Sequence, residues 1–267
     1  MKAPFAAHTR PNPPATGHAV SRVLVDAHFR RAGYYLVRSA VPPELCATLR
    51  QKLGTELESG HDVRYDDQLR PYRVDFLVDR VPEVWNALRS ELVLDVVRIL
   101  LGPNVDVVLN RHNHGTINQR GYSGVRFHRD VKSWSRNLLT AVIFLDDVTE
   151  ANGATRLVPT SHYLPSVEQP FHGGTWMDEV DEYAFLEDQA LAVTGPVGSV
   201  LLFDATLFHA TGVNSTNEER PILTLGLHAS DELSVSNYGD NHQQLCGTRA
   251  HHGNALAMAG KGAGVHD

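Results

Sequence analysis

His128 and Asp130 are separated by one residue, and a third candidate metal ligand, His209, follows much later in the chain. Alternate residues of a β-strand point to the same face, so an imidazole and a carboxylate with this spacing can approach one ion together. Two histidines and one carboxylate on one face of an octahedral metal are typical of non-heme Fe(II) sites, which leave positions open for other ligands. A hydrogen-bonded pair at a strand end is the simpler alternative for His128 and Asp130 alone. The spacing indicates an iron centre if the fold brings His209 to the pair.

Arg220 follows His209 by eleven residues and is a candidate anchor for a small acid. A guanidinium is planar and binds a carboxylate through two hydrogen bonds. The chain has no other lysine or arginine between Arg156 and Arg220, which makes Arg220 an isolated cation on this stretch. An ordinary ion pair with Glu218 or Glu219 is the alternative.

The composition limits the classes of protein to which the chain can belong. The chain has 267 residues, 42% of them hydrophobic, and a formal net charge of −7, which allows a sizeable core and argues against a nucleic-acid partner. Its two cysteines, Cys46 and Cys246, predict no disulfide framework and a reducing, cytoplasmic location. We expect neither a signal peptide nor a membrane span, because no apolar run has the required length.

The first hundred residues and the rest of the chain differ in pattern. Apolar residues recur at helical spacing in three segments, 20–31, 41–57 and 82–101, which we predict to be helices. A strand-like apolar run follows the first of them at 34–37. Short apolar runs separated by Gly, Asn and Pro then predict further strands: 105–109, 138–145, 155–158, 197–203 and 222–228. This pattern favours a mainly β fold with flanking helices, such as a sandwich or jelly roll.

The domain organisation follows from the same change of pattern. We expect a flexible arm at residues 1–19, a single domain over 20–246 and a flexible tail at 247–267. Within the domain, the helical part is expected to end near residue 104.

Five segments, in order, resemble the phytanoyl-CoA dioxygenase family of Fe(II)- and 2-oxoglutarate-dependent oxygenases. They are Phe29–Leu45, Phe127–Asp130, Asn152–His162, Gly198–Asp204 and His209–Arg220. Thr160 stands in the third segment where the family usually has glycine. The resemblance covers most of the chain and implies a double-stranded β-helix core, which is a jelly roll of the cupin type.

The resemblance also implies a site and a reaction. His128, Asp130 and His209 are the implied catalytic ligands of Fe(II). Arg220 and the hydroxyl of Thr211 are implied to bind the distal carboxylate of 2-oxoglutarate. Related halogenases have Ala or Gly in place of Asp130, so the carboxylate favours hydroxylation-type chemistry. The implied enzyme uses O2 to oxidise an unactivated C–H bond by hydroxylation, desaturation, epoxidation or cyclisation, and it releases succinate and CO2.

Residues 109–114 are a second polar segment that we expect to line the site. Strand alternation would place Asn110, His112 and His114 on the inner face, with Asn110 beside the co-substrate and the histidines toward the substrate. A shift of one residue would select Arg111 and Asn113 instead.

Two aromatic residues and an acidic segment complete the candidate site. Trp134 matches an aromatic residue near the site of ectoine-hydroxylase-like relatives, with core packing as the alternative. Trp176 is a candidate substrate contact beside the acidic segment 178–188. An acidic lid there would favour a neutral or cationic substrate, such as a small polar metabolite or natural-product intermediate, over an acyl-CoA. A solvated loop is the alternative.

Two other functions stay open on the sequence alone. One is a cupin-type metal enzyme that uses His112 and His114 without 2-oxoglutarate. The other is a non-catalytic jelly-roll binding protein. The first predicts metal loss when these two histidines are changed, and the second predicts no iron-dependent turnover.

Overall fold

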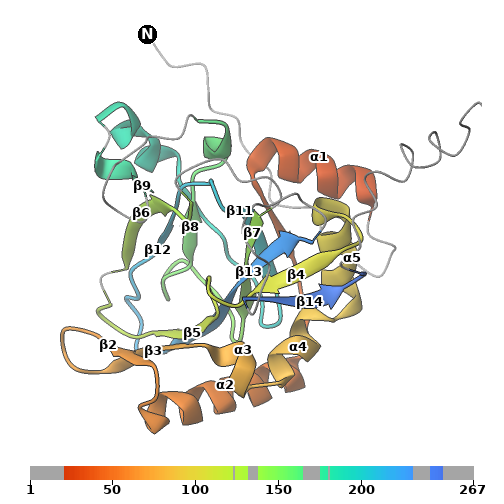
Figure 1. Cartoon of the computed structure of the whole chain (residues 1–267). Helices are drawn as coiled ribbons and strands as arrows, with labels where there is room; N and C mark the ends of the chain where they lie inside the picture. The colour runs from red at the N-terminus through yellow and green to blue at the C-terminus, as the bar shows by residue number, and fades with distance from the viewer. Residues whose placement is uncertain are drawn as a thin grey trace, which may run out of the picture.

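The computed structural model describes residues 21–122, 124–131, 138–164, 175–179, 181–230 and 241–248. Two antiparallel sheets lie at its centre, and helices pack on the larger sheet (Figure 1). The predicted arm at 1–19 and most of the predicted tail lie outside the described residues. No helix in the described ranges is long and apolar enough to cross a membrane.

The helices agree with the sequence prediction in two cases of three. They are α1 (Arg22–Ala32), α2 (Pro43–Ser59), α3 (Leu77–Arg80), α4 (Glu83–Leu88) and α5 (Glu91–Leu101), with 3-10 turns η1 (Ser161–Tyr163), η2 (Met177–Glu179) and η3 (Asp181–Gln189). The prediction of one helix over 82–101 is wrong, because the helical conformation is interrupted between α4 and α5. Ser90 has an extended ψ of 141° at this break. The apolar spacing continues across it, so periodicity alone could not reveal the interruption.

The larger sheet has nine strands among the described residues. Its main path is β1 (Tyr34–Val37), β11 (Val200–Asp204), β7 (Leu138–Phe144), β13 (Arg220–Ala229), β5 (His114–Asn118), β3 (Pro71–Asp75) and β2 (Val63–Tyr65). Beside this path, β4 (Val105–Val108) pairs with β13 and with β14 (His242–Cys246). Every predicted strand overlaps an observed strand in one of the two sheets. In the larger sheet, β2, β3, β14 and all but the first residue of β5 were not predicted.

The smaller sheet carries much of the candidate site. Its order is β10 (Leu191–Ala192), β8 (Thr155–Leu157), β12 (His209–Thr211), β6 (Val125–Arg129) and β9 (Thr175–Trp176). Two facing antiparallel sheets of this kind form a jelly roll, as the sequence predicts.

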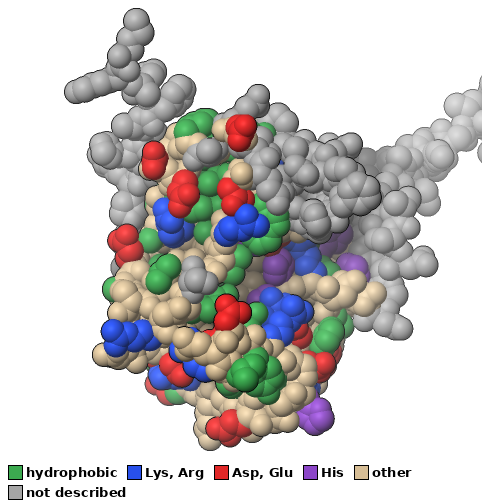
Figure 2. All heavy atoms as spheres, turned by 90° about the vertical axis from the view of Figure 1, so that its left-hand side faces the viewer, with side chains coloured by type: hydrophobic (Ala, Val, Ile, Leu, Met, Phe, Trp, Pro, Cys, Tyr) green, Lys and Arg blue, Asp and Glu red, His purple; other side chains and the backbone are tan. Residues whose placement is uncertain are grey.

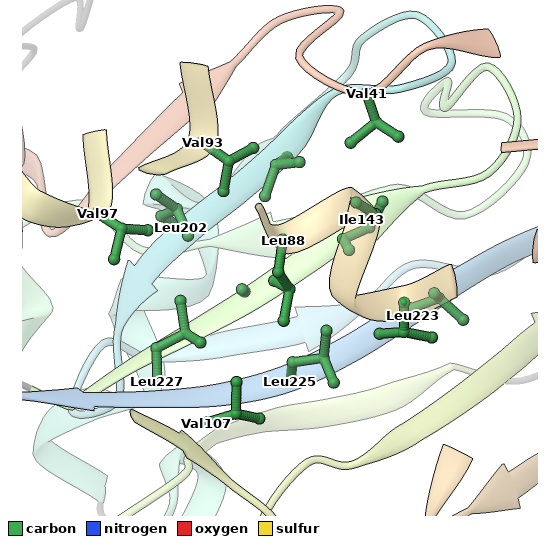
Figure 3. Packing of buried hydrophobic residues seen from close by; sticks show 14 of the residues in the cluster. Val41, Leu88, Val93, Val97, Val107, Ile143, Leu202, Leu223, Leu225 and Leu227 are labelled. Carbon is green, nitrogen blue, oxygen red and sulfur yellow. The ribbon is translucent and has the colours of Figure 1, made fainter. Parts of the chain in front are cut away.

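The helices support the larger sheet from its outer side. Leu88, Val93 and Val97 pack with Leu202 and Leu225 in one apolar cluster, and all five are almost fully buried (Figure 3). Burial of one such side chain contributes about 1.5–3 kcal/mol. A sheet fixed in this way can present polar side chains on its other face at defined positions.

Candidate metal centre

Strands β6 and β12 place two histidines side by side. His128 and His209 are register partners, and their ring centroids are 4.3 Å apart. Asp130 follows β6 directly, with Oδ1 at 3.9 Å from Nε2 of His128 and 3.5 Å from Nε2 of His209. Within the described ranges, this is the one group of three His, Cys, Asp or Glu residues whose ligand atoms lie close enough to hold a metal ion.

Backbone carbonyls fix the tautomer of both histidines. Nδ1 of His128 lies 2.9 Å from the carbonyl oxygen of Arg126, and Nδ1 of His209 lies 3.0 Å from that of Leu207. Because each Nδ1–H donates to a carbonyl, Nε2 is the ring nitrogen that each histidine directs toward Asp130 and can offer to a metal ion. The donor set is therefore two imidazole nitrogens and one carboxylate oxygen, which fits Fe(II).

The ionisation of the three groups also suits a cation. Burial is the main cause that lowers the pKa of His128, to about 4. Burial opposes ionisation of Asp130, but His209 and His112 outweigh it and hold the pKa of the carboxyl well below its usual range. Burial likewise opposes protonation of His209, but Asp130 raises the pKa of this imidazole overall. A metal ion would replace the proton that His209 shares with Asp130.

A cavity of about 190 Å³ lies between the two sheets and is bordered by both candidate histidine ligands. Its described lining includes four histidines, two arginines and two tyrosines: His112, His114, His128, His209, Arg73, Arg220, Tyr72 and Tyr122. Figure 2 shows histidine side chains next to Lys or Arg side chains near the middle of one face of the molecule. The polar part of the lining therefore includes several side chains that can donate hydrogen bonds to a ligand.

Arg220 lies at the start of β13 and is buried, at 1% exposed. Its Nε donates to the carbonyl oxygen of Asn152 at 3.2 Å, while Nη1 and Nη2 have no hydrogen-bond partner among the described residues. Burial lowers the pKa of Arg220 to about 10, so it remains a cation at neutral pH. A buried cation with two unused donors requires an anion, and a carboxylate matches its geometry. Thr211 borders the same cavity.

Tyr122 is a cavity residue that the sequence analysis missed. It lies near enough to Arg220 for the two to interact electrostatically, and its ring centroid is 5.6 Å from that of Tyr72. Burial is the main cause that raises the pKa of Tyr122, so its hydroxyl stays protonated and able to donate. Tyr72 and Arg73 were missed because they lie on β3, a strand whose sequence has no clear apolar alternation.

Glycine at position 153 is required for the placement of Arg220. Gly153 has φ of +86°, and a Cβ there would lie 2.6 Å from the carbonyl oxygen of Gly212. The preceding residue, Asn152, supplies the carbonyl that orients the guanidinium.

We expect Gly153→Ala to lower the free energy of unfolding by about 1–3 kcal/mol and to weaken 2-oxoglutarate binding through movement of Asn152. Urea unfolding and calorimetry measure the two effects. Gly54→Ala is the matched control, because Gly54 lies in helix α2 and a Cβ there meets nothing within 4 Å. The control is expected to stabilise the protein by about 0.5–1 kcal/mol. Equal stability of the two variants would contradict the prediction.

The expected strand alternation over 109–114 is wrong. Val108 pairs with Gly226 of β13, and His114 pairs with Thr224, so residues 109–113 bulge out opposite Leu225 alone. Asn110 therefore shares no strand face with His112 and His114, and it is not among the residues that line the cavity. Both histidines do line the cavity. Their ring centroids are 5.8 Å apart, and no third ligand among the described residues completes a metal group with them.

The two tryptophans predicted to lie near the site, Trp134 and Trp176, differ in what the structure shows of them. Trp134 lies outside the described residues. Trp176 is the register partner of His128, with ring centroids 5.1 Å apart, and the guanidinium of Arg126 lies over its ring at 4.5 Å. Trp176 thus packs beside a candidate ligand but is not among the described cavity-lining residues.

The acidic segment 178–188 does not reach the cavity with any of its described residues. Asp178 forms an ion pair with Arg126 at 2.5 Å, and Glu187 lies 3.4 Å from Arg156. Two of its acidic side chains are thus paired with arginines of the smaller sheet. The inference of a neutral or cationic substrate from this segment is not supported by these contacts.

The buried imidazole of His114 is expected to make the stability of the protein depend on pH. It is 7% exposed, and burial, followed by Arg73 and His112, holds its pKa well below 6.5. The unfolded chain binds a proton near pH 6.5 that the folded chain does not, so this contribution to stability is present above that pH and is lost as pH falls.

We expect the free energy of unfolding of the metal-free protein to fall with pH below about 6.5, by up to about 1.4 kcal/mol per pH unit from His114 alone. A His114→Asn variant should show a shallower slope. Denaturant unfolding at several pH values between 5 and 7.5 provides the comparison. Parallel slopes for the two proteins would show that His114 is not responsible.

The fold and the clustered ligands define a class of protein, a jelly roll with a candidate metal site of two histidines and one carboxylate. Residues 29–222 match the phytanoyl-CoA dioxygenase (PhyH) family, so the chain belongs to this family.

Curated relatives and solved structures agree with this assignment. The chain is 30% identical over 178 residues to a probable alpha-ketoglutarate-dependent hypophosphite dioxygenase of Stutzerimonas stutzeri, an alignment that covers 61% of this chain and 60% of the relative. It thus spans less than two thirds of that protein. It is 26% identical to the ectoine dioxygenase of Sphingopyxis alaskensis, over 71% of this chain and 70% of that one.

The structure of the epimerase SnoN with Fe3+, alpha ketoglutarate and nogalamycin RO is similar, with a TM-score of 0.70 at 17% identity. That alignment covers 84% of this chain and 98% of the other. EctD from S. alaskensis with bound Fe has a TM-score of 0.64 at 21% identity, over 83% of this chain and 82% of the other. At these identities, the two structures support the jelly-roll fold.

Proposed function

We propose that this protein is an Fe(II)- and 2-oxoglutarate-dependent dioxygenase that oxidises an unactivated C–H bond of a small polar molecule. His128, Asp130 and His209 hold the metal, and Arg220 holds the distal carboxylate of 2-oxoglutarate. The observation that carries the proposal is the buried guanidinium of Arg220, whose Nη atoms have no partner among the described residues and which lines the same cavity as the two histidines. Bound Fe(II) and 2-oxoglutarate supply the oxidising chemistry, with O2 consumed and succinate and CO2 released.

The residues of the chain bind, orient and shield the reactants. Thr211 and the hydroxyl of Tyr122 border the cavity and donate hydrogen bonds to the co-substrate beside Arg220. Val125, Val142 and Ile222 form apolar parts of the same wall and keep water from the methylene groups of the acid. Asp130 occupies the position that is Ala or Gly in related halogenases, which supports oxygen insertion or desaturation over halogenation.

The rest of the lining indicates the kind of substrate. Tyr72, Arg73 and His114 are hydrogen-bonding side chains that border the cavity in addition to the proposed metal and co-substrate residues. Relatives named for hypophosphite and ectoine act on small polar molecules. The substrate is accordingly a small polar metabolite or natural-product intermediate that presents hydrogen-bond acceptors to these side chains. A cytoplasmic location is part of this proposal and rests on the two free cysteines.

The proposal is tested by supplying Fe(II) and 2-oxoglutarate and measuring succinate release across a panel of small polar compounds. We expect at least one compound to stimulate succinate release and to gain oxygen or lose hydrogen in equal amount. The His128→Ala variant should show neither effect. Bound compounds without any iron-dependent succinate release would instead favour a binding protein.

A further inference from the structure

The carboxylate of Asp130 is held by more than its neighbours in the triad. Its side chain is 1% exposed, and three further side chains contact it. Nε2 of His112 lies 2.9 Å from Oδ1, and Oγ1 of Thr140 donates to Oδ2 at 2.5 Å. Nη2 of Arg111 lies 3.5 Å from Oδ2.

These contacts engage both oxygens of the carboxylate. An ionised carboxylate has two oxygens with about four lone-pair positions. Thr140 donates a hydrogen bond to Oδ2, where Arg111 adds an ion-pair contact without a hydrogen bond, and His112 occupies one position on Oδ1. Oδ1 is also the oxygen that faces Nε2 of His128 and of His209. One position on Oδ1, directed toward the two candidate histidine ligands, therefore remains for a metal ion.

Two of the three contacts come from the bulge at residues 109–113. His112 has φ of +52°, a left-handed conformation that is uncommon for residues other than glycine. Such strain persists where the surrounding structure requires it and is concentrated at functional sites. Gly226 of β13 lies beneath the bulge, and a Cβ there would approach the carbonyl oxygen of Arg111 to 3.0 Å. The bulge is thus seated closely on β13 and directs Arg111 and His112 to the carboxylate.

We propose that Arg111 and His112 are positioning residues, which together with Thr140 hold Asp130 so that it offers a single oxygen to the metal. A carboxylate that bound through both oxygens would fill a coordination position that the reaction needs. The inference rests on the proposed role of Asp130 as a ligand. It assigns His112 neither as a ligand, as in a cupin-type site, nor primarily as a substrate contact.

The test uses the metal alone, without co-substrate or substrate. Asn tolerates the left-handed conformation but is too short to reach Oδ1, so His112→Asn removes the contact without adding backbone strain. We expect this variant to bind Mn(II) about 10–100-fold more weakly by calorimetry, the usual cost of losing a partner that orients a ligand. The absorption spectrum of the Co(II)-loaded variant should also differ from wild type, because the coordination of Asp130 changes.

Two further variants make the result specific. His112→Gln is expected to restore most of the Mn(II) affinity and the Co(II) spectrum, because its longer side chain returns an N–H donor toward Oδ1. His61→Asn, at an exposed histidine before β2, is the matched control and should bind Mn(II) like wild type. Thermal unfolding establishes that each variant is folded.

Two outcomes would overturn the inference. Wild-type Mn(II) affinity and an unchanged Co(II) spectrum in His112→Asn would show that the contact does not position Asp130. Loss of Mn(II) binding as complete as in His128→Ala, without rescue by Gln, would make His112 itself a ligand. Unchanged Mn(II) binding in His128→Ala is a separate result, and it would refute the proposed metal site rather than the role of His112.

Discussion

Replacement of His128 by alanine is expected to lower the affinity of the protein for Fe(II) by more than about 100-fold, and His209→Ala and Asp130→Ala should act alike. The reason is that loss of a residue that only supports a ligand already costs about 10–100-fold, so loss of a ligand must cost more. The three ligand atoms lie within 4.8 Å of one another, with both Nδ1–H groups bonded to backbone carbonyls, so each Nε2 is free for the ion.

Anaerobic Fe(II) titration followed by calorimetry gives the affinity of each variant. His162→Ala is a suitable control, because this histidine bonds to the carbonyl oxygen of Arg30 and does not line the cavity. Full iron loading of a protein that lacks both His128 and His209 would exclude the proposed site.

Replacement of Arg220 by alanine is expected to weaken 2-oxoglutarate binding by about 30-fold to several thousand-fold, which corresponds to the 2–5 kcal/mol lost when one partner of a buried charge pair is truncated. Fe(II) binding should change little, because Arg220 is not a member of the metal group. Arg220→Lys should recover part of the affinity, since it restores the charge but not the two parallel hydrogen bonds.

Calorimetry on the Mn(II)-loaded protein measures the co-substrate separately from turnover. Arg50→Ala, which removes a surface arginine paired with Asp146, is the control. Wild-type affinity in Arg220→Ala would move the anchor to another cation at the cavity, and Arg73, which also lines it, would then be the first to examine.

The parts of the site that the sequence revealed are those with local spacing. His128 lies on β6 and Asp130 follows that strand directly, so their separation by one residue brings them together. The apolar run before His209 corresponds to β11, after which the chain returns to the smaller sheet. The family resemblance pointed to His209 and Arg220, and the structure places both on the same cavity. For these residues, local spacing and the family resemblance together are enough.

The parts that the sequence did not reveal depend on long-range pairing. The bulge at 109–113 exists because β4 and β5 both pair with β13 in positions that leave five residues opposite one. Nothing in the local pattern of Asn110 or Arg111 indicates this. Tyr72 and Arg73 reach the cavity because β3 pairs with β5. This pairing could not be predicted, because the sequence of β3 is mostly polar and lacks the alternation that marks a strand.

The central claim is that one cavity holds Fe(II) on His128, Asp130 and His209 and 2-oxoglutarate on Arg220. The most direct measurement is a crystal structure of the protein grown anaerobically with Fe(II) and 2-oxoglutarate, with anomalous data at the iron edge. The account predicts one iron peak within bonding distance of both Nε2 atoms and of Oδ1 of Asp130, with the distal carboxylate of 2-oxoglutarate on the guanidinium of Arg220. An iron peak on His112 and His114, or a 2-oxoglutarate molecule bound away from Arg220, would contradict it.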